Sequence, residues 1–199
     1  MRRTLIHEAD PRTFWQRFPE KEELNQYWYS ADTVAALAKE AIEETPEQSG
    51  RIAFLSTPSV YFACRNQQRD DLTTRECFLF DFDSKFAPEG RFFVPFDFKK
   101  PENVPEKLAG TFDFVIVDPP FVTHEVWELY AKTIKLLLRS KNSKVLLTTI
   151  EENATVIYNL LGCRLRTFKP SIPHLVYQYA IYTNYESPSL DIVNPEISI

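Results

Sequence analysis

Residues 118–121 read Asp-Pro-Pro-Phe and come directly after an apolar run, FDFVIV at 112–117. Proline has no backbone N–H, so Pro119 and Pro120 leave a rigid segment whose carbonyl groups can only accept hydrogen bonds. Asp118 adds a carboxylate acceptor, and Phe121 offers a flat face to a base, a methyl group or a cation. The tetrapeptide therefore suits an amino group whose protons need acceptors. The simpler interpretation is a rigid strand end with Phe121 in the core.

Polar residues also follow three other predicted strands. In an open parallel sheet, ligands bind beyond the carboxyl ends of the strands, near the point where the strand order reverses. A single Asp at such a place is more often a turn former that bonds nearby amides. Several acids at one edge, however, suit a ligand that donates hydrogen bonds from ribose hydroxyls and amines. The candidate contacts are Ser56, Thr57, Pro58, Ser59, Asp81, Asp83 and Asp97.

An aromatic run, Tyr27, Trp28 and Tyr29, stands just before the first predicted helix. Aromatic side chains bury large apolar areas, while Tyr and Trp keep a polar group that needs a partner. The run is either a cover over the core or one wall of a substrate pocket, and the sequence favours neither.

The hydrophobic pattern predicts strands that alternate with helices. The apolar run at 112–117 is typical of a parallel strand that is covered on both faces. The predicted strands are 51–56, 76–83, 91–98, 112–117 and 144–149, and the predicted helices are 31–44, 58–68, a short turn near 104–110, and one after each of the last two strands.

Residues that favour helix ends support these boundaries. Ser and Thr accept hydrogen bonds from the first free amides of a helix, Pro suits its first position, and Gly its end. The predicted N-caps are Ser30, Thr57 and Thr123, a capping box is expected at Thr149 and Glu152, and Gly162 should end the last helix.

Residues 163–170 and 175–185 alternate apolar and polar side chains across a short connection, which predicts an antiparallel hairpin at the sheet edge. The fold class is therefore α/β: a three-layer sandwich with a mostly parallel sheet and a C-terminal antiparallel hairpin. We expect residues 1–24 to be a loosely attached, partly flexible lead-in, residues 25–187 to form the domain, and residues 188–199 to be a tail.

The composition fits one domain of 199 residues that is 44% hydrophobic and carries a net charge of −5. Because nucleic-acid binding relies on Lys and Arg that neutralise phosphates, this balance argues against an autonomous DNA or RNA binder. The three Cys and three His residues are scattered, which predicts no metal site and no disulfide framework. No apolar segment is long enough for a signal peptide or a membrane span, so we expect a cytoplasmic protein.

Several segments also resemble one enzyme family. An [N/D]PP[F/Y] sequence after the fourth strand resembles the class I S-adenosylmethionine-dependent methyltransferases that modify amino groups. The segments QYWYS (26–30), RIAFLSTPSVY (51–61), FDFDSKFA (80–87), and LLGCRLRTFKP (160–170) through YTNYES (182–187) resemble, more narrowly, the translation elongation factor 1-alpha lysine methyltransferases. That family was formerly labelled as N6-adenine DNA methyltransferases, and the resemblance extends from about residue 26 to residue 187.

The resemblance implies a Rossmann-like class I methyltransferase fold and a role for each matching residue. By similarity, Asp118, Pro119 and Phe121 accept the amine. The candidate substrate contacts are Tyr27, Trp28, Tyr29 and Phe121. The residues that would contact S-adenosylmethionine are Asp81 or Asp83 at the ribose, Asp97 near the adenine, Ser56, Thr57, Pro58 and Ser59 near the methionine part, and Asp118.

One segment departs from the general superfamily pattern. The first loop usually carries several glycines, so that the backbone can approach the cofactor, but this chain has Ser-Thr-Pro-Ser at 56–59 and four glycines in total. The resembling family shares this shortage. Hydroxyl groups and the amide end of the following helix could hold the methionine carboxylate instead.

The resemblance implies a monomeric protein-lysine N-methyltransferase that acts on translation elongation factor 1-alpha, with Asp118 positioning the amine. One alternative acceptor is adenine N6 in DNA or RNA, with Phe121 stacked on a flipped base. The acidic balance argues against it. A second alternative is a non-catalytic methyltransferase-like scaffold, which the Ser-Thr-Pro-Ser loop supports and the intact carboxylates and Asp-Pro-Pro-Phe segment oppose.

Overall fold

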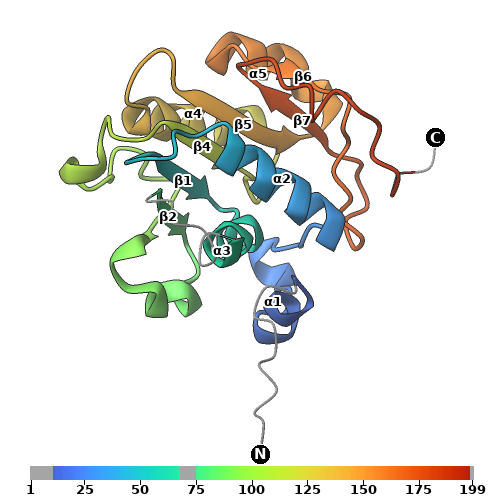
Figure 1. Cartoon of the computed structure of the whole chain (residues 1–199), viewed down its shortest axis with the longest axis horizontal. Helices are drawn as coiled ribbons and strands as arrows, with labels where there is room; N and C mark the ends of the chain where they lie inside the picture. Colours follow the sequence, from blue (N-terminus) through green and yellow to red (C-terminus); the bar gives the residue numbers. More distant parts are fainter. Residues whose placement is uncertain (1–10, 68–74, 198–199) are drawn as a thin grey trace, which may run out of the picture.

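The structure is a computed structural model that describes residues 11–67 and 75–197. In this part of the chain, seven strands form one sheet in the order β3-β2-β1-β4-β5-β7-β6, with helices on both faces (Figure 1). Strands β1 to β5 pair in parallel, and β7 is antiparallel to both β5 and β6. The strands are β1 (Arg51–Leu55), β2 (Glu76–Asp81), β3 (Phe93–Pro95), β4 (Phe114–Val117), β5 (Lys144–Thr149), β6 (Arg164–Leu165) and β7 (Ala180–Thr183).

This topology confirms the predicted three-layer α/β sandwich. The helices are α1 (Pro11–Arg17), α2 (Ala31–Glu43), α3 (Pro58–Gln67), α4 (His124–Leu137) and α5 (Ala154–Leu161), and the 3-10 turns are η1 (Glu22–Leu24), η2 (Ser84–Phe92), η3 (Glu106–Leu108) and η4 (Glu151–Asn153). The predicted end of the second helix at residue 68 lies outside the described residues. Among the described residues, no helix is long and apolar enough to span a bilayer.

Two apolar cores cover the two faces of the sheet. Because successive side chains of a strand point to opposite faces, Ile52 and Phe54 of β1 pack with α2 and α3, while Ala53 and Leu55 pack with α4. The side chains of β4 alternate between the two cores in the same way. Each parallel strand is therefore apolar on both sides, which explains the continuous hydrophobic runs in the sequence.

Three predicted helix ends are confirmed. The Ser30 side chain accepts a hydrogen bond from the Thr33 N–H, and the Thr123 side chain accepts one from the Val126 N–H. Gly162 ends α5 with φ 69°, a left-handed conformation that Gly adopts without steric cost.

Two predicted caps are wrong. The Thr57 hydroxyl is buried and has no hydrogen-bond partner in the described residues, so it does not cap α3. The Thr149 hydroxyl accepts hydrogen bonds from Trp127 Nε1 and Asn153 Nδ2, because Thr149 is still part of β5 and a 3-10 turn separates it from α5. For Thr149, a tertiary contact with Trp127 thus replaces the helix cap that local spacing predicted.

The predicted C-terminal hairpin is confirmed, but its strands are much shorter than expected. Strand β6 has two residues and β7 has four, and residues 166–179 form a long irregular loop between them. Pro170 and Pro173 cannot donate ladder hydrogen bonds, so this segment cannot extend either strand. Instead, the Ser171 carbonyl accepts a hydrogen bond from the Ser30 N–H at 2.8 Å, which brings the loop to the N-terminus of α2.

The described parts of the expected lead-in and tail pack on the domain. Phe14 of α1 is 7% exposed and joins the core that lies under α2 and α3. Near the C-terminus, Leu190 is 1% exposed, and Ser30 Oγ donates a hydrogen bond to Glu196. Phe14 and Leu190 thus belong to the core on this face of the sheet, and the division into lead-in, domain and tail stays a prediction.

We expect Phe14→Ala to destabilise the protein by about 3–5 kcal/mol, because it removes a buried aromatic ring and leaves a cavity. The melting temperature should fall by at least about 6 °C, since roughly 1 kcal/mol corresponds to 2–4 °C at this chain length. Calorimetry would measure this shift. Gln16→Ala, at an exposed position of the same helix, is the control, and equal melting temperatures for the two variants would contradict the docking of α1.

Candidate active site

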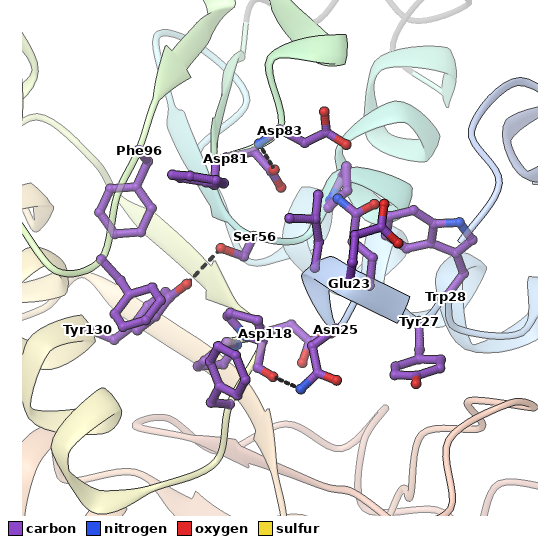
Figure 2. A pocket seen from close by; sticks show the side chains of 18 of the residues that line it. Glu23, Asn25, Tyr27, Trp28, Ser56, Asp81, Asp83, Phe96, Asp118 and Tyr130 are labelled. Carbon is purple, nitrogen blue, oxygen red and sulfur yellow. Dashed lines mark hydrogen bonds between the residues drawn. The ribbon is translucent and has the colours of Figure 1, made fainter. Parts of the chain in front are cut away.

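A cavity of about 400 Å³ opens at the carboxyl ends of β1, β2 and β4. The strand order reverses between β1 and β4, which is where ligands bind in open α/β sheets. Figure 2 shows Ser56 between Asp81 and Asp118, with Phe96 and Tyr130 on one side and Tyr27 and Trp28 on the other.

Most of the residues predicted as site residues line this cavity. They are Tyr27, Trp28, Ser56, Pro58, Asp81, Asp83, Asp97, Asp118, Pro119 and Phe121. Three others do not line it: Tyr29, Thr57 and Ser59 are 2%, 2% and 4% exposed and lie behind the cavity wall. These three residues stand beside lining residues in the sequence, but the local sequence does not show which side chains point into the cavity.

Asp118 is held by hydrogen bonds from two neighbouring segments. Its N–H donates to the Leu55 carbonyl at 3.1 Å, so pairing between β4 and β1 continues up to the acid. Thr148 Oγ1 of β5 donates to Asp118 Oδ1 at 3.0 Å, and Tyr29 Oη lies 2.7 Å from Thr148 Oγ1. Since Thr148 has a single hydroxyl proton, Tyr29 must be the donor in that pair. The Tyr29 and Thr148 hydroxyls form a relay, that is, a chain of hydrogen bonds that ends at the Asp118 carboxylate.

Burial raises the pKa of Asp118 from 3.8 to about 7, although the hydrogen bonds from Tyr29 and Thr148 lower it. Burial and the nearby Asp118 charge also raise the pKa of the Tyr29 and Tyr179 hydroxyls well above the usual value, so both remain protonated. Perturbed groups of this kind in a cleft are typical of functional sites. Asp118 therefore changes charge near neutral pH.

The two proline carbonyls have different surroundings. Asn25 Nδ2 donates a hydrogen bond to the Pro120 carbonyl, so this acceptor is already occupied. Within the described residues, the Pro119 carbonyl accepts no hydrogen bond and lines the cavity with Asp118. The acceptors available to an incoming amine are therefore the Pro119 carbonyl and Asp118.

Phe121 is 48% exposed and does not lie in the core. Its ring meets Phe98 edge-on at 6.3 Å between centroids, and Phe98 stacks on Tyr130 at 5.8 Å. Phe96 then meets Tyr130 edge-on at 5.6 Å. Pairs of this geometry are mutually stabilising, so the four rings form a continuous aromatic wall beside the acceptors.

Ser56 takes the conformation that a glycine would take in a glycine-rich loop. Its φ is 56°, in the left-handed region that is costly for residues with a Cβ. The Ser56 hydroxyl lies 2.8 Å from Tyr130 Oη and joins β1 to α4 across the cavity (Figure 2). A serine thus makes the sharp turn after β1 and uses its side chain to fix the aromatic wall.

Asp81 ends β2 and Asp83 follows it, and these two acids differ in their surroundings. Asp81 Oδ1 accepts a hydrogen bond from the Asp83 N–H at 2.8 Å, and burial raises the Asp81 pKa to about 7, although that hydrogen bond lowers it. Asp83 is paired with Lys21 at 2.8 Å and Lys85 at 3.3 Å. Burial opposes ionisation of Asp83, but the Lys21 and Lys85 contacts bring its pKa below the usual value. Asp81 is therefore the acid with spare acceptor capacity.

Several lining residues were not identified from the sequence. Asn25 has a φ of 54°, and Asn is one of the few residues that adopts this conformation readily. Its position after η1 is the one local signal that could have singled it out. Five others stand next to predicted site residues in the sequence: Gln26, Phe82, Phe96, Phe98 and Pro120. The rest carry no local signal, because distant segments bring them to the cavity: they are Glu23, Leu24, Lys99, Tyr130, Ile172, Leu175 and Tyr179.

Comparison with known proteins agrees with this geometry. The profile of a family described as "Probable N6-adenine methyltransferase" matches residues 20–187. The chain belongs to this methyltransferase family. Among its curated relatives, the EEF1A lysine methyltransferase 1 of Bos taurus is 38% identical over 170 residues, which cover 84% of this chain and 72% of that protein. The protein-lysine N-methyltransferase EFM5 of Saccharomyces cerevisiae is 33% identical over 187 residues, which cover 86% of this chain and 75% of that protein.

Solved structures show that the family fold is shared more widely. A Corynebacterium glutamicum protein superposes with a TM-score of 0.55 at 14% identity and covers 94% of this chain and 93% of its own. A candidate RNA methyltransferase from Pyrococcus horikoshii superposes with a TM-score of 0.52 at 17% identity, covering 82% of this chain and 88% of its own. At these identities the likeness shows the Rossmann-like fold alone.

We expect Asp118→Asn to stabilise the protein increasingly as the pH rises. Because the folded-state pKa of Asp118 lies above the unfolded value, the wild type loses stability between about pH 4 and pH 7, and the full cost is present above pH 7. The amide carries no charge and avoids this cost. Its melting temperature should exceed that of the wild type by about 2–6 °C at about pH 8, with a smaller difference near pH 5.

Thermal unfolding at several pH values would measure this difference. Asp32→Asn, at an exposed position of α2, is the matched control and should show no growing difference. A constant offset for Asp118→Asn across this pH range would show that Asp118 does not titrate as described.

Proposed function

We propose that this chain is an S-adenosylmethionine-dependent protein-lysine N-methyltransferase whose substrate is translation elongation factor 1-alpha. The observation that carries this proposal is the pair of acceptors at the cavity, Asp118 and the Pro119 carbonyl, beside an exposed aromatic ring. The curated relatives named as lysine methyltransferases support it. That the protein is a monomer and acts in the cytoplasm remains a prediction.

The residues at the cavity suit S-adenosylmethionine. The volume of about 400 Å³ lies within the range of cofactor sites. Asp81 has a carboxylate oxygen for ribose hydroxyls, and Phe82, which is 69% exposed, offers a ring for the adenine base.

Bound at this site, S-adenosylmethionine supplies a methyl group on a sulfonium sulfur, which an amine nitrogen can attack. Asp118 Oδ2 and the Pro119 carbonyl accept the N–H groups of the lysine amine and direct its lone pair away from the strand end. The aromatic wall that ends in Phe121 excludes water from the aliphatic part of the lysine. Most of the rate would come from holding the reacting atoms in line.

Asp118 orients the amine rather than removing its proton. The pKa of a lysine side chain is about 10.4 in water, while that of Asp118 is about 7. The proton therefore favours the amine, and a charged Asp118 strengthens that preference. The carboxylate instead attracts the ammonium group into the cavity and fixes its nitrogen, and the ammonium proton leaves to water or to another base before the neutral nitrogen attacks the methyl group.

The family description favours adenine N6 as a second candidate acceptor. The exposed Phe121 ring could stack on a flipped base. Among the described residues, however, the cavity is lined by Glu23, Asp81, Asp83, Asp97 and Asp118 and by one cationic side chain, Lys99. Phosphate groups would be repelled at such a site, and a lysine ammonium would be attracted.

The test is methyl transfer to purified elongation factor 1-alpha with labelled cofactor, followed by peptide mass spectrometry. We expect label on one or more lysines. Label in DNA or RNA oligonucleotides instead would favour the adenine function. The absence of a saturable heat of S-adenosylmethionine binding would favour a non-catalytic scaffold that has lost its cofactor.

We expect Asp118→Ala to lower turnover by about 10²-fold or more, because the amine loses its main acceptor and its alignment. Cofactor affinity, measured by calorimetry, should be largely retained, because Asp81 and Phe82 contribute the proposed ribose and adenine contacts. Phe82→Ala is the matched comparison and should weaken cofactor binding instead. Near-normal turnover of Asp118→Ala would contradict the role of this acid.

We expect Thr148→Val to move the acidic limb of the kcat/KM profile to higher pH by about 0.5–1 unit. The Thr148 hydroxyl stabilises the charged form of Asp118, so its loss raises the Asp118 pKa. Thr148→Ser keeps the hydroxyl and should keep the wild-type limb. Thr133→Val removes an equally buried hydroxyl that donates to the Pro101 carbonyl, and a shift of the same size in this control would show that Thr148 has no specific positioning role.

A further inference from the structure

Exposed apolar side chains are concentrated at the mouth of the cavity. Phe82, Phe121, Val176 and Tyr177 are 69%, 48%, 91% and 68% exposed. Phe82 and Phe121 line the cavity themselves, and Val176 and Tyr177 directly follow the lining residue Leu175. We call these four side chains the apolar rim. Clusters of exposed apolar residues beside a site commonly mark a surface for another protein.

Three separate loops contribute to the apolar rim. Phe82 follows β2, Phe121 precedes α4, and Val176 and Tyr177 belong to the long loop between β6 and β7. Chain segments far apart in the sequence therefore place apolar groups around one opening. Residues 166–179, shown in orange in Figure 1, reach this end of the sheet instead of continuing as strands.

Hydrogen bonds hold the β6–β7 loop while leaving its apolar side chains exposed. Gln178 Nε2 donates to the carbonyls of Pro170 and Tyr179, at 2.9 Å and 2.8 Å. His174 Nδ1 lies 2.6 Å from Glu20 Oε2, which joins the loop to the segment before η1. Val176 and Tyr177 are thus presented on a braced loop with most of their side-chain surface exposed.

The charge inside the apolar rim indicates what kind of group enters. Of the residues that the structure describes, five with carboxylates and one with an ammonium line the cavity. A cationic group at the centre and apolar contacts around it match a lysine on the surface of a folded protein. A nucleic acid would place phosphates against these carboxylates and would leave the rim without a matching surface.

We propose that the apolar rim is the docking surface for the folded elongation factor, and that it binds apolar side chains around the lysine that enters the cavity. This inference rests on the proposed function. It adds that recognition depends on a surface larger than the lysine itself, so a short lysine peptide should be a poor substrate.

The test is Val176→Ser combined with Tyr177→Ser, because neither residue lines the cavity. We expect the KM for the folded elongation factor to rise on the order of tenfold, as loss of two contact residues at an interface would cause. The kcat and the cofactor affinity should be unchanged. With a short peptide that contains the target lysine, the double variant and the wild type should be equal.

Leu136→Ser is the matched control. Leu136 is 42% exposed on α4, and its carbonyl accepts a hydrogen bond from the Gly110 N–H, before β4 and at the opposite end of the sheet from the cavity. An unchanged KM in the double variant, or an equal rise in Leu136→Ser, would overturn the docking surface. A dimer in sedimentation experiments that the double variant dissociates would also overturn it, because a second copy would then cover the rim.

Different experimental results would contradict the docking surface and the proposed function. If the wild type adds no label to the elongation factor, the proposed function fails, and the docking surface falls with it. If the wild type methylates the factor and the double variant does so with the same KM, only the docking surface fails. Label in oligonucleotides that is lost in the double variant would overturn both.

Discussion

The site depends on the carboxylate of Asp118, which lies in a partly apolar environment at the end of the central strand β4. Asp118 emerges from β4 at the point where the strand order reverses, and its N–H continues the pairing with β1. Burial makes its charge costly, and the hydroxyl relay from Tyr29 through Thr148 offsets part of that cost. The fold therefore places one strong, oriented acceptor, and the Pro119 carbonyl and the aromatic wall are arranged around it.

The segment before α2 closes the site by bonding to two different strand ends. Lys21 pairs with Asp83 after β2, and Asn25 donates to the Pro120 carbonyl after β4. Lys85 Nζ also donates to Gln26 Oε1 at 3.1 Å. Because these contacts bridge the two halves of the sheet, residues 21–26 form a wall of the cavity that a sheet with helices alone would lack. The shape of the cavity therefore depends on the ordered structure of residues 21–26.

The acidic lining of the cavity and the exposed apolar side chains at its mouth together favour an amine on a protein over an amine on a nucleic-acid base. The Asp-Pro-Pro-Phe segment serves either acceptor, because both present N–H donors next to a flat or aliphatic group. The acidic lining and the apolar rim favour the protein. Ser56 explains how this cavity forms with so few glycines: a strained left-handed serine makes the turn, and its hydroxyl bonds Tyr130.

Local patterns were sufficient for the layer order, the parallel strands and most cavity acids, because burial on both faces produces continuous apolar runs and parallel strands end at one edge. They were also sufficient for the caps at Ser30, Thr123 and Gly162, which depend on neighbouring backbone alone. Only the tertiary structure decided that Tyr29 lies behind the cavity, that Thr149 bonds Trp127, that Pro120 is already bonded, and that residues 166–179 form a cavity wall. Each of these outcomes depends on contacts with residues distant in the chain, and such contacts leave no periodicity or spacing in the sequence.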